Sequence, residues 1–284
     1  MVTRKTTQGM FLMRPSAKVR NCIRYCIALA QKRSKVRIHS IVFLSNHYHI
    51  VLTDTLGNVP VFTEELNKLI ARAFNCMLGR RENFWSGGDQ TSQVVLAEAS
   101  DVFAKTLYLL VNPTQAGLVS RGEDWPGVRL FKKGKYISKK PKFFFRSMAD
   151  GGKLPQKAYV ELTPPPIDAQ PQVCDEVVER AVRAKEKQIR LAFKLAGKTF
   201  MGAAKIMKQD IYASPKRPAP MFNLSPQVAC RDKWRRVEIL QQLVEFARDH
   251  KEKREKFVAG VRDVVFPAGT YKMARQFGAC CEKL

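Results

Sequence analysis

Apolar positions change their spacing several times over the first 120 residues. A short apolar run at 9–13 predicts a strand, and Ser16 is placed to cap the helix that follows. The β-branched run 36–44 predicts a second strand and residues 47–53 a third, with a tight turn at Ser45-Asn46 between them. The apolar positions of the first helix share one face: Val19, Cys22, Ile23, Cys26, Ile27 and Ala30.

The pattern continues with two further helices and a strand between them. Residues 93–96 predict the strand. The last helix covers 101–111 and is expected to end at Asn112-Pro113, because proline disfavours helical backbone in the residue before it. Its apolar face would contain Phe103, Leu107 and Leu110. The apolar face of the earlier helix contains Leu66, Leu69, Ile70, Ala73, Phe74, Met77 and Leu78.

The order of these elements predicts an α+β protein. Strand, helix, strand, strand, helix, strand is the order of a ferredoxin-like (RRM-like) antiparallel sheet, and one extra helix follows it. The two earlier helices would cover one face of the sheet and leave the other face open. We expect residues 1–128 to form this domain.

The rest of the chain is expected to contain a connector and a second unit. Residues 129–146 combine eight basic residues with five aromatic ones, and a rigid proline run ends at Pro166. The segment 129–167 is therefore predicted to be a basic, aromatic stretch and connector. Helical patterns around 173–195 and 228–261 predict a basic, mainly α-helical C-terminal domain over 168–284.

Charge narrows the class of partner. The chain has 50 Lys and Arg against 25 Asp and Glu, a formal net charge of +25. Residues 166–284 carry 24 basic and 14 acidic residues, a net charge of +10, so both halves are basic. Such an excess favours a polyanion, either nucleic acid or an anionic membrane, over a merely soluble basic surface.

Other features of the sequence indicate where in the cell the protein is located. No apolar run is long enough to cross a bilayer, and the N-terminal segment lacks the apolar stretch of a secretory signal. The seven cysteines include no Cys-x-x-Cys pair and suggest no disulfide framework. We therefore expect a cytoplasmic protein.

Two histidines stand out in the predicted third strand. His47 and His49 are two residues apart, so strand periodicity places both on one face, with Tyr48 and Ile50 on the other. Imidazoles at this spacing can bind one divalent ion. The alternative is a pair of solvated or core-edge histidines, and the spacing alone leaves both open. The other two histidines of the chain have no such partner and are expected to be structural or surface residues.

The predicted helix 101–111 contains a second candidate. Tyr108 and Asn112 are four residues apart and share a helix face. Taken alone, such a phenol is usually a packed aromatic with a wet hydroxyl, and such an asparagine a helix stop. A phenol is a poor nucleophile because its pKa is about 10, but a divalent ion on a phosphodiester lowers the barrier to its attack. The two candidates together therefore favour a tyrosine nucleophile beside a metal.

Four motifs occur in an order that resembles a known family. They are FLSNHYHIVL at 43–52, ENFW at 82–85, YLLVNPTQAGLV at 108–119 and DWPG at 124–127. In this order and spacing, the first 130 residues resemble the single-tyrosine HUH transposases, and among them the REP-associated tyrosine transposases.

The resemblance implies a function for each candidate residue. Tyr108 would be the nucleophile, and His47, His49 and Asn112 would hold Mg²⁺ or Mn²⁺. The implied activity is cleavage and strand transfer of single-stranded DNA at hairpins or inverted repeats, through a covalent 5′-phosphotyrosine and a free 3′-hydroxyl. The resemblance also implies a bacterial, nucleoid-associated protein with no membrane partner, and it leaves a homodimer open.

Two positions depart from the family pattern. Ser45 stands where the family has proline, which loosens the predicted turn. Tyr48 is bulkier than the aliphatic residue usual between the two histidines. Neither departure removes a chemical group from the candidate site.

Basic and aromatic residues outside the candidate site are expected to contact DNA. In 129–146, cationic side chains would follow phosphates and aromatic ones would stack on bases. The alternative is a solvated basic loop with Phe143, Phe144 and Phe145 anchored in the core. For 168–284, DNA binding is expected, and the alternative is a basic dimerisation or packing unit. The candidate DNA-binding residues are Arg4, Lys5, Arg129, Lys132, Lys133, Lys135, Tyr136, Lys139, Lys140 and Lys142.

Three other functions fit part of the pattern. A replication or mobilisation nickase shares the chemistry, but the chain is short, has no helicase motif and carries the Asn-Pro-x-x-Ala-Gly signature. A non-cleaving protein that binds nucleic acid on an RRM-like sheet would carry aromatic residues where this chain has histidines. A hydrolytic zinc enzyme would need an acidic residue near His47 and His49, and the sequence places none there.

Overall fold

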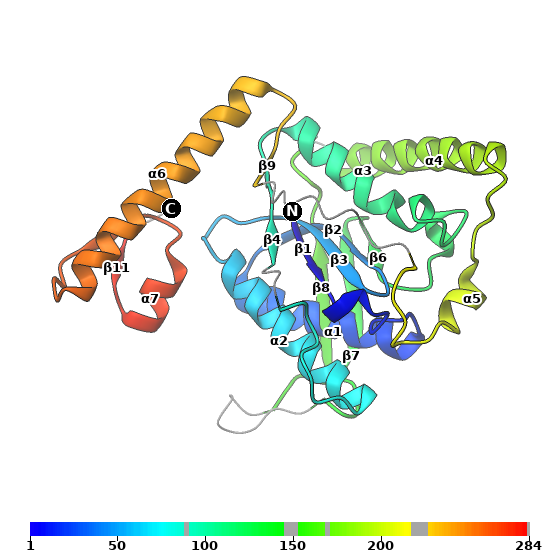
Figure 1. The fold of residues 1–284 in the computed structure, drawn as a ribbon, viewed down its shortest axis with the longest axis horizontal. Coiled ribbons are helices and arrows are strands. Elements are labelled where there is room, and N and C mark those ends of the chain that lie inside the picture. The colour runs from blue at the N-terminus through cyan, green and yellow to red at the C-terminus, as the bar shows by residue number, and fades with distance from the viewer. Residues whose placement is uncertain (88–90, 145–152, 168–170, 217–226, 283–284) are drawn as a thin grey trace.

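The computed structural model is a mixed α+β protein and describes residues 1–87, 91–144, 153–167, 171–216 and 227–282. Within that part of the chain, the main sheet has seven strands and is mostly antiparallel (Figure 1). Its hydrogen-bonded order is β4-β1-β3-β2-β8-β7, and β6 also pairs with β2. These strands are β1 (Val2–Lys5), β2 (Arg37–Phe43), β3 (His47–Thr53), β4 (Ser92–Gln93), β6 (Arg129–Leu130), β7 (Gly134–Lys139) and β8 (Lys157–Leu162).

Helices surround this sheet on both faces and extend beyond it. Two further strand pairs are short and parallel: β5 (Val95–Leu96) with β9 (Val228–Ala229), and β10 (Val265–Phe266) with β11 (Cys280–Cys281). None of the described helices is long and apolar enough to cross a membrane. The helices are α1 (Ala17–Ser34), α2 (Val59–Leu78), α3 (Ala99–Gln115), α4 (Pro171–Leu195), α5 (Ala203–Met207), α6 (Lys233–Val258) and α7 (Tyr271–Phe277), with 3-10 turns η1 (Thr7–Gly9) and η2 (Gly122–Asp124).

The first strand is not where the apolar run predicts it. β1 covers Val2–Lys5, whereas the run 9–13 begins at the end of η1 and continues as a loop. Leu12 and Met13 in that loop are fully buried, so their apolar character serves the core and not a strand. β1 is mostly polar, but it pairs antiparallel with both β3 and β4, and this pairing supplies its backbone hydrogen bonds.

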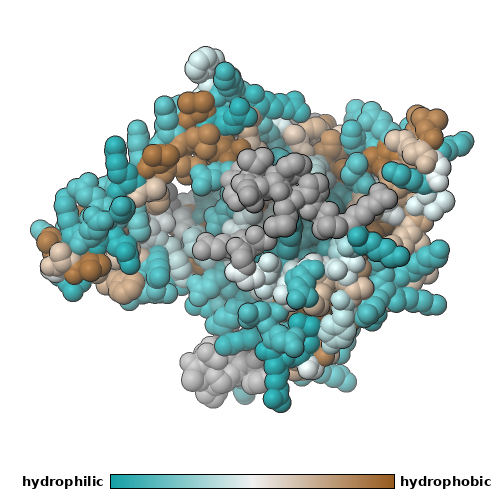
Figure 2. Space-filling view, viewed as in Figure 1, coloured by the Kyte–Doolittle hydropathy of each residue, from teal (hydrophilic) through white to brown (hydrophobic). Residues whose placement is uncertain are grey.

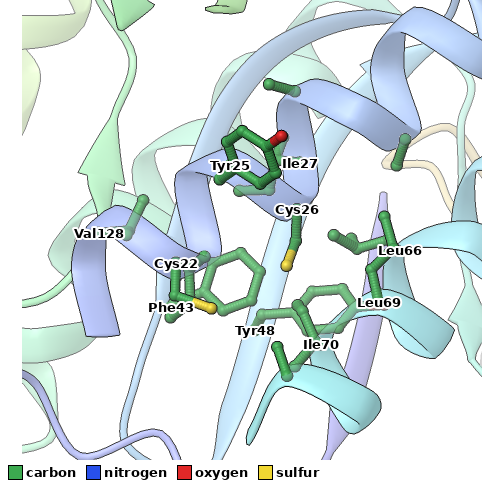
Figure 3. Close-up of a cluster of buried hydrophobic side chains, with 14 of the residues drawn as sticks. Cys22, Tyr25, Cys26, Ile27, Phe43, Tyr48, Leu66, Leu69, Ile70 and Val128 are labelled. Carbon is green, nitrogen blue, oxygen red and sulfur yellow. The ribbon is translucent and has the colours of Figure 1, made fainter. Parts of the chain in front are cut away.

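α1 and α2 cover one face of the sheet, as the sequence predicts. Ser16 caps α1 by accepting a hydrogen bond from the Val19 backbone N–H at 3.1 Å. Figure 3 shows the resulting core, with α1 and α2 contributing side chains against the sheet. The bulk of Tyr48 is accommodated there because its ring stacks on Phe43 and its hydroxyl donates to Asn67 Oδ1 at 2.9 Å.

The opposite face of the sheet is not open along its whole length. Val42 and Val51 of the sheet pack there against Leu109 and Leu110 of α3, and the same core includes Val182 of α4. The predicted open face is therefore wrong for this region. A second helical layer lies over it because Val42 of β2, Leu44 just after it and Val51 of β3 are apolar on this face.

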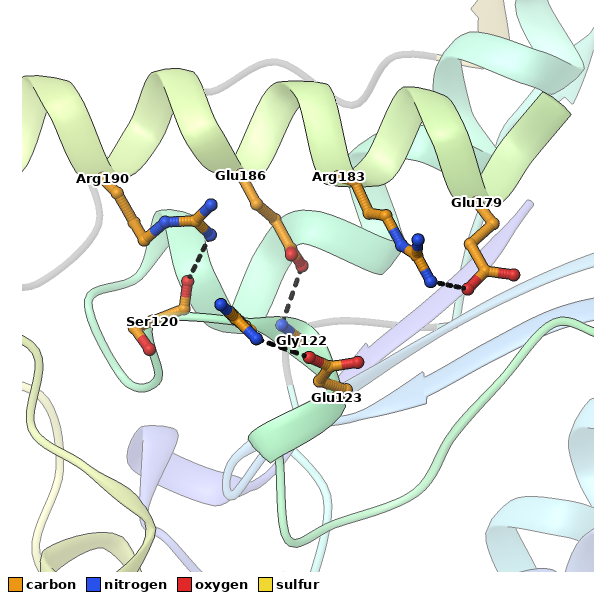
Figure 4. A network of polar contacts seen from close by, with 8 residues as sticks. Ser120, Gly122, Glu123, Glu179, Arg183, Glu186 and Arg190 are labelled. Atoms are coloured by element: carbon orange, nitrogen blue, oxygen red, sulfur yellow. Dashed lines mark hydrogen bonds and ion pairs between the residues drawn. The ribbon is translucent and has the colours of Figure 1, made fainter. Parts of the chain in front are cut away.

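α4 and α5 belong to the N-terminal unit and not to a separate domain. Val178, Val182 and Ile189 of α4 and Ile206 of α5 share one core with α3 and the sheet. Polar contacts join α4 to the loop after α3: the buried Glu186 carboxylate accepts the Gly122 backbone N–H at 2.7 Å (Figure 4). The predicted start of a second domain at residue 168 therefore does not separate two cores.

The predicted connector 129–167 is largely part of the main sheet. It contributes β6, β7 and β8, and β7 and β8 form an antiparallel pair. Phe144 is buried against Tyr25 of α1, with ring centroids 5.3 Å apart, and Phe143 packs at the edge of the same core. The core-anchored alternative is therefore the observed one for these two residues, whereas Phe145 lies outside the described residues.

α3 does not end at Asn112-Pro113. It continues through Pro113 to Gln115, and the Ala116 N–H donates to the Asn112 carbonyl at 2.9 Å. Gly117 follows with a φ of 70°, the left-handed conformation in which helices commonly end. Phe103 and Leu107 are only half-buried, because the buried face of α3 contains Val102, Thr106, Leu109 and Leu110.

The C-terminal part of the chain forms an arm that projects from this unit (Figure 1). α6 is exposed along most of its length, and it meets β9 through a small cluster of Val228, Cys230 and Ile239. A second cluster around Phe257 and Phe266 joins α6 to α7 and β10. Figure 2 shows hydrophobic residues along this arm, and its large exposed side chains include Trp234, Val237, Leu240 and Val244.

Candidate functional site

β3 places the two candidate histidines on the sheet face that lies away from α1 and α2. Its alternate residues Tyr48 and Ile50 are fully buried in the core under those helices, so His47 and His49 point to the other side. The two imidazole rings are 5.0 Å apart between centroids. This distance lets two ring nitrogens approach a common ion.

α3 brings Tyr108 and Asn112 to the same place. The Asn112 Nδ2 atom lies 3.4 Å from His49 Nε2, and the Tyr108 ring lies 5.7 Å from the His49 ring. Tyr108 is 48% exposed, so its hydroxyl can meet a substrate in solvent. Leu109 and Leu110, between the two residues, are buried against the sheet and hold this face of α3 over β3. The structure thus gathers all four candidates.

Each imidazole has one nitrogen held by a neighbouring side chain. Asn46 Oδ1 lies 2.7 Å from His47 Nδ1, and the Asn46 Nδ2 donates to the Gly9 carbonyl at 3.1 Å. Because that amide orientation makes Asn46 Oδ1 an acceptor, His47 Nδ1 carries the proton and Nε2 keeps its lone pair. Thr3 Oγ1 lies 2.8 Å from His49 Nδ1, since Thr3 is the β1 partner of His49, and its hydroxyl can either donate to that nitrogen or accept from it.

Burial keeps both imidazoles neutral. It lowers the pKa of His47 to about 4, with a smaller effect from the charge of Lys5. It lowers the pKa of His49 to about 3, and the charges of His47, Lys5 and Lys105 act in the same direction. At neutral pH the nitrogen lone pairs are therefore available to a metal.

Two lysines add positive charge beside the four candidates. Lys5 is the β1 partner of His47. Lys105 lies one helical turn before Tyr108, with its Nζ 5.7 Å from the Tyr108 ring centroid. An ammonium group in this position is suited to a phosphodiester, which is anionic.

Two imidazoles and one amide are only a partial set of ligands for a divalent ion. Among the described residues, no three His, Cys, Asp or Glu side chains cluster as a metal site. An ion here would be held by the Nε2 atoms of His47 and His49 and by the oxygen of Asn112, whose amide would have to turn over because its Nδ2 atom now faces His49. The amide oxygen suits Mg²⁺ or Mn²⁺, whereas imidazole nitrogens also suit other divalent ions, and the open positions would take substrate oxygens and water.

The ten candidate DNA-binding residues are not brought to one surface. Lys5 lies at the histidine face, but Arg4 points to the other side of β1, over Trp85 at 5.6 Å and bonded to Thr91 Oγ1 at 3.2 Å. Arg129 is largely buried and donates from Nε to the Leu110 carbonyl at 3.0 Å. These contacts give Arg4 and Arg129 structural roles.

The remaining candidates follow the sheet edge away from the histidines. Lys132 pairs with Glu179 of α4 at 2.8 Å, and the Lys133 backbone N–H donates to Asp175. Tyr136 points toward the α1 side and its hydroxyl donates to the Lys132 carbonyl at 2.8 Å. Four others lie on β7 or just after it: Lys135, Lys139, Lys140 and Lys142.

Sequence reasoning missed three residues that shape the site. Asn46 precedes His47, so its proximity could have been expected from the sequence. Lys105 is three residues before Tyr108 on a helix, a spacing that places both side chains on neighbouring positions. Thr3 could not have been found, because its contact with His49 depends on the β1–β3 register and the sequence misplaces β1.

Comparison with known proteins adds one structural match. No family model matches the chain, and no curated protein matches it. A solved structure of a REP-associated tyrosine transposase bound to a REP hairpin is similar at 18% identity, with a TM-score of 0.34 over 44% of this chain and 72% of that chain. At this level of similarity, the match defines neither the fold nor the activity of the chain.

Proposed function

We propose that the protein is a metal-dependent single-tyrosine nuclease and strand transferase that acts on single-stranded DNA. The proposal rests on one observation: α3 lies over β3, so that Asn112 is 3.4 Å from His49 and the ring of Tyr108 packs next to the ring of His49. A neutral imidazole pair, an amide and an exposed phenol are a set of groups suited to phosphoryl transfer.

Tyr108 is the nucleophile in this proposal. Its hydroxyl oxygen forms a bond to phosphorus as the bond from phosphorus to the 3′ oxygen breaks. The phenol loses its proton to solvent, and the leaving oxygen takes up a proton to become a free 3′-hydroxyl. The product is a 5′-phosphotyrosine, which stores the cleaved bond and allows rejoining to another 3′-hydroxyl.

The metal would be Mg²⁺ or Mn²⁺, held by His47, His49 and Asn112. When bound, it would polarise the phosphodiester and stabilise the charge that develops on it. Thr3 and Asn46 orient the two imidazoles, and Lys5 and Lys105 attract the DNA backbone to the site. A net charge of +25 favours a nucleic acid substrate over a neutral one.

The finer fold and substrate assignments also belong to this proposal. The strand order β4-β1-β3-β2, with α1 and α2 on one face, supports a ferredoxin-like sheet in the first 96 residues. We take hairpins or inverted repeats as the substrate from the motif resemblance, because nothing in the site selects a DNA sequence.

A covalent adduct tests the proposal. The purified protein, a labelled single-stranded hairpin and Mn²⁺ should yield a protein–DNA species that survives denaturation. Tyr108→Phe should lose the adduct and keep DNA binding, because only the hydroxyl is removed. An adduct that persists in Tyr108→Phe would exclude Tyr108 as the nucleophile.

Tyr212→Phe is a matched control, because Tyr212 is exposed to a similar degree as Tyr108 and lies after α5. It should form the adduct at the parent rate. Equal loss of adduct in both variants, or cleavage at an undiminished rate in chelator, would contradict the proposal and favour a binding-only or metal-independent protein.

A further inference from the structure

A second surface of the sheet carries exposed basic and aromatic residues. On β8, Ala158 and Val160 are buried under α1, so Tyr159 between them points away from that core. The matching face of the paired strand β7 is exposed as well. We call this surface the β7–β8 platform, and its residues are Lys135, Ile137 and Lys139 of β7 with Lys157, Tyr159 and Glu161 of β8.

Two cross-strand pairs on the platform are incompletely satisfied in the protein alone: one leaves apolar area in water and the other brings two like charges together. Tyr159 and Ile137 lie directly opposite each other and are 53% and 47% exposed, so much of their apolar area stays in water. Lys139 and Lys157 also lie directly opposite each other, and like charges in this position destabilise a sheet. A bound anion would relieve the repulsion between the two lysines.

A groove beside the platform extends the positive charge. Its volume is about 580 Å³, and it lies between β8 and the last turns of α1. Lys32, Lys35 and Arg37 line it together with Lys157 and Tyr159. Among the described lining residues, the one carboxylate is that of Glu161, which forms an ion pair with Lys135 at 3.8 Å. The groove therefore favours a phosphate chain over a cationic or neutral ligand.

We propose that the β7–β8 platform and its groove bind a single-stranded nucleic acid. One base stacks on Tyr159, and the flanking phosphates contact the Lys139–Lys157 pair and the groove. Aromatic side chains within a cationic groove bind single strands because every base offers a flat face. An anionic membrane would engage the lysines but would leave Tyr159 without a planar partner.

The platform lies on the same side of the sheet as the candidate site. Tyr48 and Ile50, the alternate neighbours of His47 and His49, share the α1–α2 core with Ala158 and Val160. β8 is two strands from β3, about 10 Å across the sheet, and the pairing of Ile38 with Leu162 places Tyr159 about seven residues from His49 along the strand direction, which corresponds to about 23 Å. If the proposed function holds, the platform holds the strand that Tyr108 cuts. Binding itself does not need Tyr108.

Binding to an unstructured, labelled oligothymidylate tests the inference in full-length protein that carries Tyr108→Phe, so that no cleavage intervenes. Adding Tyr159→Ala should weaken binding about tenfold, because one base no longer stacks. Adding Lys139→Gln with Lys157→Gln should reduce the slope of log affinity against log salt by about 1.4, which is about 0.7 for each phosphate of a single strand that is no longer neutralised. The melting temperature of this lysine variant should not fall, because a repulsive pair has been removed.

Matched controls separate the platform from general basic charge. Tyr212→Ala and Lys68→Gln alter an exposed tyrosine and an exposed lysine elsewhere and should bind as the parent does. Parent-like affinity in Tyr159→Ala, or equal losses in the controls, would overturn the inference. Loss of binding to phosphatidylserine vesicles without loss of oligothymidylate binding would also overturn it in favour of a membrane. If the Tyr108 adduct never forms but these variants lose binding, the inference stands and the proposed nuclease function fails.

Discussion

At the scale of single residues, the orientation of His47 and His49 depends on side chains that are not themselves candidate ligands. Asn46 and Thr3 each contact an Nδ1 atom, at 2.7 and 2.8 Å, and so leave both Nε2 atoms free of these two contacts. Outer hydrogen bonds of this kind fix the tautomer and the ring orientation of a histidine ligand. Mutation of Thr3 tests this role more clearly than mutation of Asn46, because the backbone pairing of Thr3 with His49 does not involve the hydroxyl.

Thr3→Val should weaken Mn²⁺ binding while leaving the fold intact. Valine has the shape of threonine without the oxygen, so the β1–β3 pairing remains and the His49 ring loses its partner. We expect a loss of affinity of about 10-fold or more, as for other outer-shell partners of metal ligands. Titration of free Mn²⁺ by electron paramagnetic resonance measures it without reference to cleavage. Thr3→Ser should restore the affinity, and a Thr3→Val protein with parent affinity would show that Thr3 has no such role.

His39 is another buried histidine, outside the candidate site, and its burial predicts that the stability of the fold depends on pH. Its Nε2 lies 2.8 Å from Thr53 Oγ1 and its Nδ1 3.1 Å from the Thr163 carbonyl. Burial lowers its pKa below the ordinary value, and the backbone hydrogen bonds oppose this only in part. In the unfolded chain the group has a pKa of about 6.5, so between that pH and its folded pKa only the unfolded state takes up the proton.

The free energy of unfolding should therefore fall as the pH drops below about 6.5. His39→Gln removes this titration and should make the decline shallower, by at most about 1.4 kcal/mol per pH unit. Urea unfolding at pH 7.5, 6.5 and 5.5 gives the slope for both proteins. The comparison of slopes is independent of any constant loss of stability in the variant, and identical slopes would rule out His39 as a contributor.

At the scale of elements, the sequence predicted what depends on local periodicity and missed what depends on tertiary pairing. α1, β2, β3 and α2 lie where the apolar spacing places them, and β3 has the predicted bounds. β1 was misplaced because Leu12 and Met13 fill the core from a loop, and apolar spacing does not distinguish the two uses. α3 extends past its predicted end because its last turn packs into the tertiary core. Pro113 has no backbone N–H, so it leaves no unpaired donor inside the helix.

In the candidate site, too, the sequence predicted what depends on local spacing and missed what depends on tertiary packing. The i, i+2 spacing of the histidines and the i, i+4 spacing of Tyr108 and Asn112 predicted which side chains share a face. The distance between β3 and α3 could not be predicted, since it depends on how the apolar positions of α3 pack against Val42 and Val51. The supporting layer was missed as well, because α4 follows α3 only after a long separation in the chain.

α4 should therefore stabilise α3, the helix that carries Tyr108 and Asn112, by packing in the same core. Ile189 of α4 is buried in the core that contains Leu109 and Leu110 of α3. Ile189→Ala should lower the free energy of unfolding by about 2–5 kcal/mol, through lost burial and an unfilled cavity. Leu191→Ala, two residues away and 58% exposed, should change it by less than about 0.5 kcal/mol. Chemical denaturation of both proteins decides the matter, and similar small losses would mean that α4 does not pack there in solution.

At the scale of the whole molecule, the division of the chain falls after α5 and not before α4. The segment after α5 returns to the N-terminal unit, where the Phe11 N–H donates to the Ala213 carbonyl at 2.9 Å and Arg14 donates to the Gln209 carbonyl. The arm beyond it has its own small core around Phe257 and Phe266. Contacts between the arm and the main unit, within the described part of the chain, are limited to β9 with β5 and a few neighbouring residues.

Two truncations should therefore behave differently. A chain that ends after Lys216 keeps α4 and α5, so it should fold and form the Tyr108 adduct with a labelled hairpin. A chain that ends after Pro166 loses Val178, Val182 and Ile189 from the core beneath α3. It should expose that apolar face, aggregate or unfold, and form little adduct, although every candidate site residue is still present.

Salt dependence of DNA binding then separates the two accounts of the arm. If α6 binds DNA, the chain that ends after Lys216 should bind with a shallower salt slope than the full chain, by about 0.7 for each phosphate of a single strand that α6 neutralises. An equal slope would assign the exposed face of α6 to packing against protein, since its apolar residues then have no nucleic acid partner. Adduct formation at the full-length rate by the chain that ends after Pro166 would contradict the whole division, because it would show that α3 keeps its place over β3 without α4.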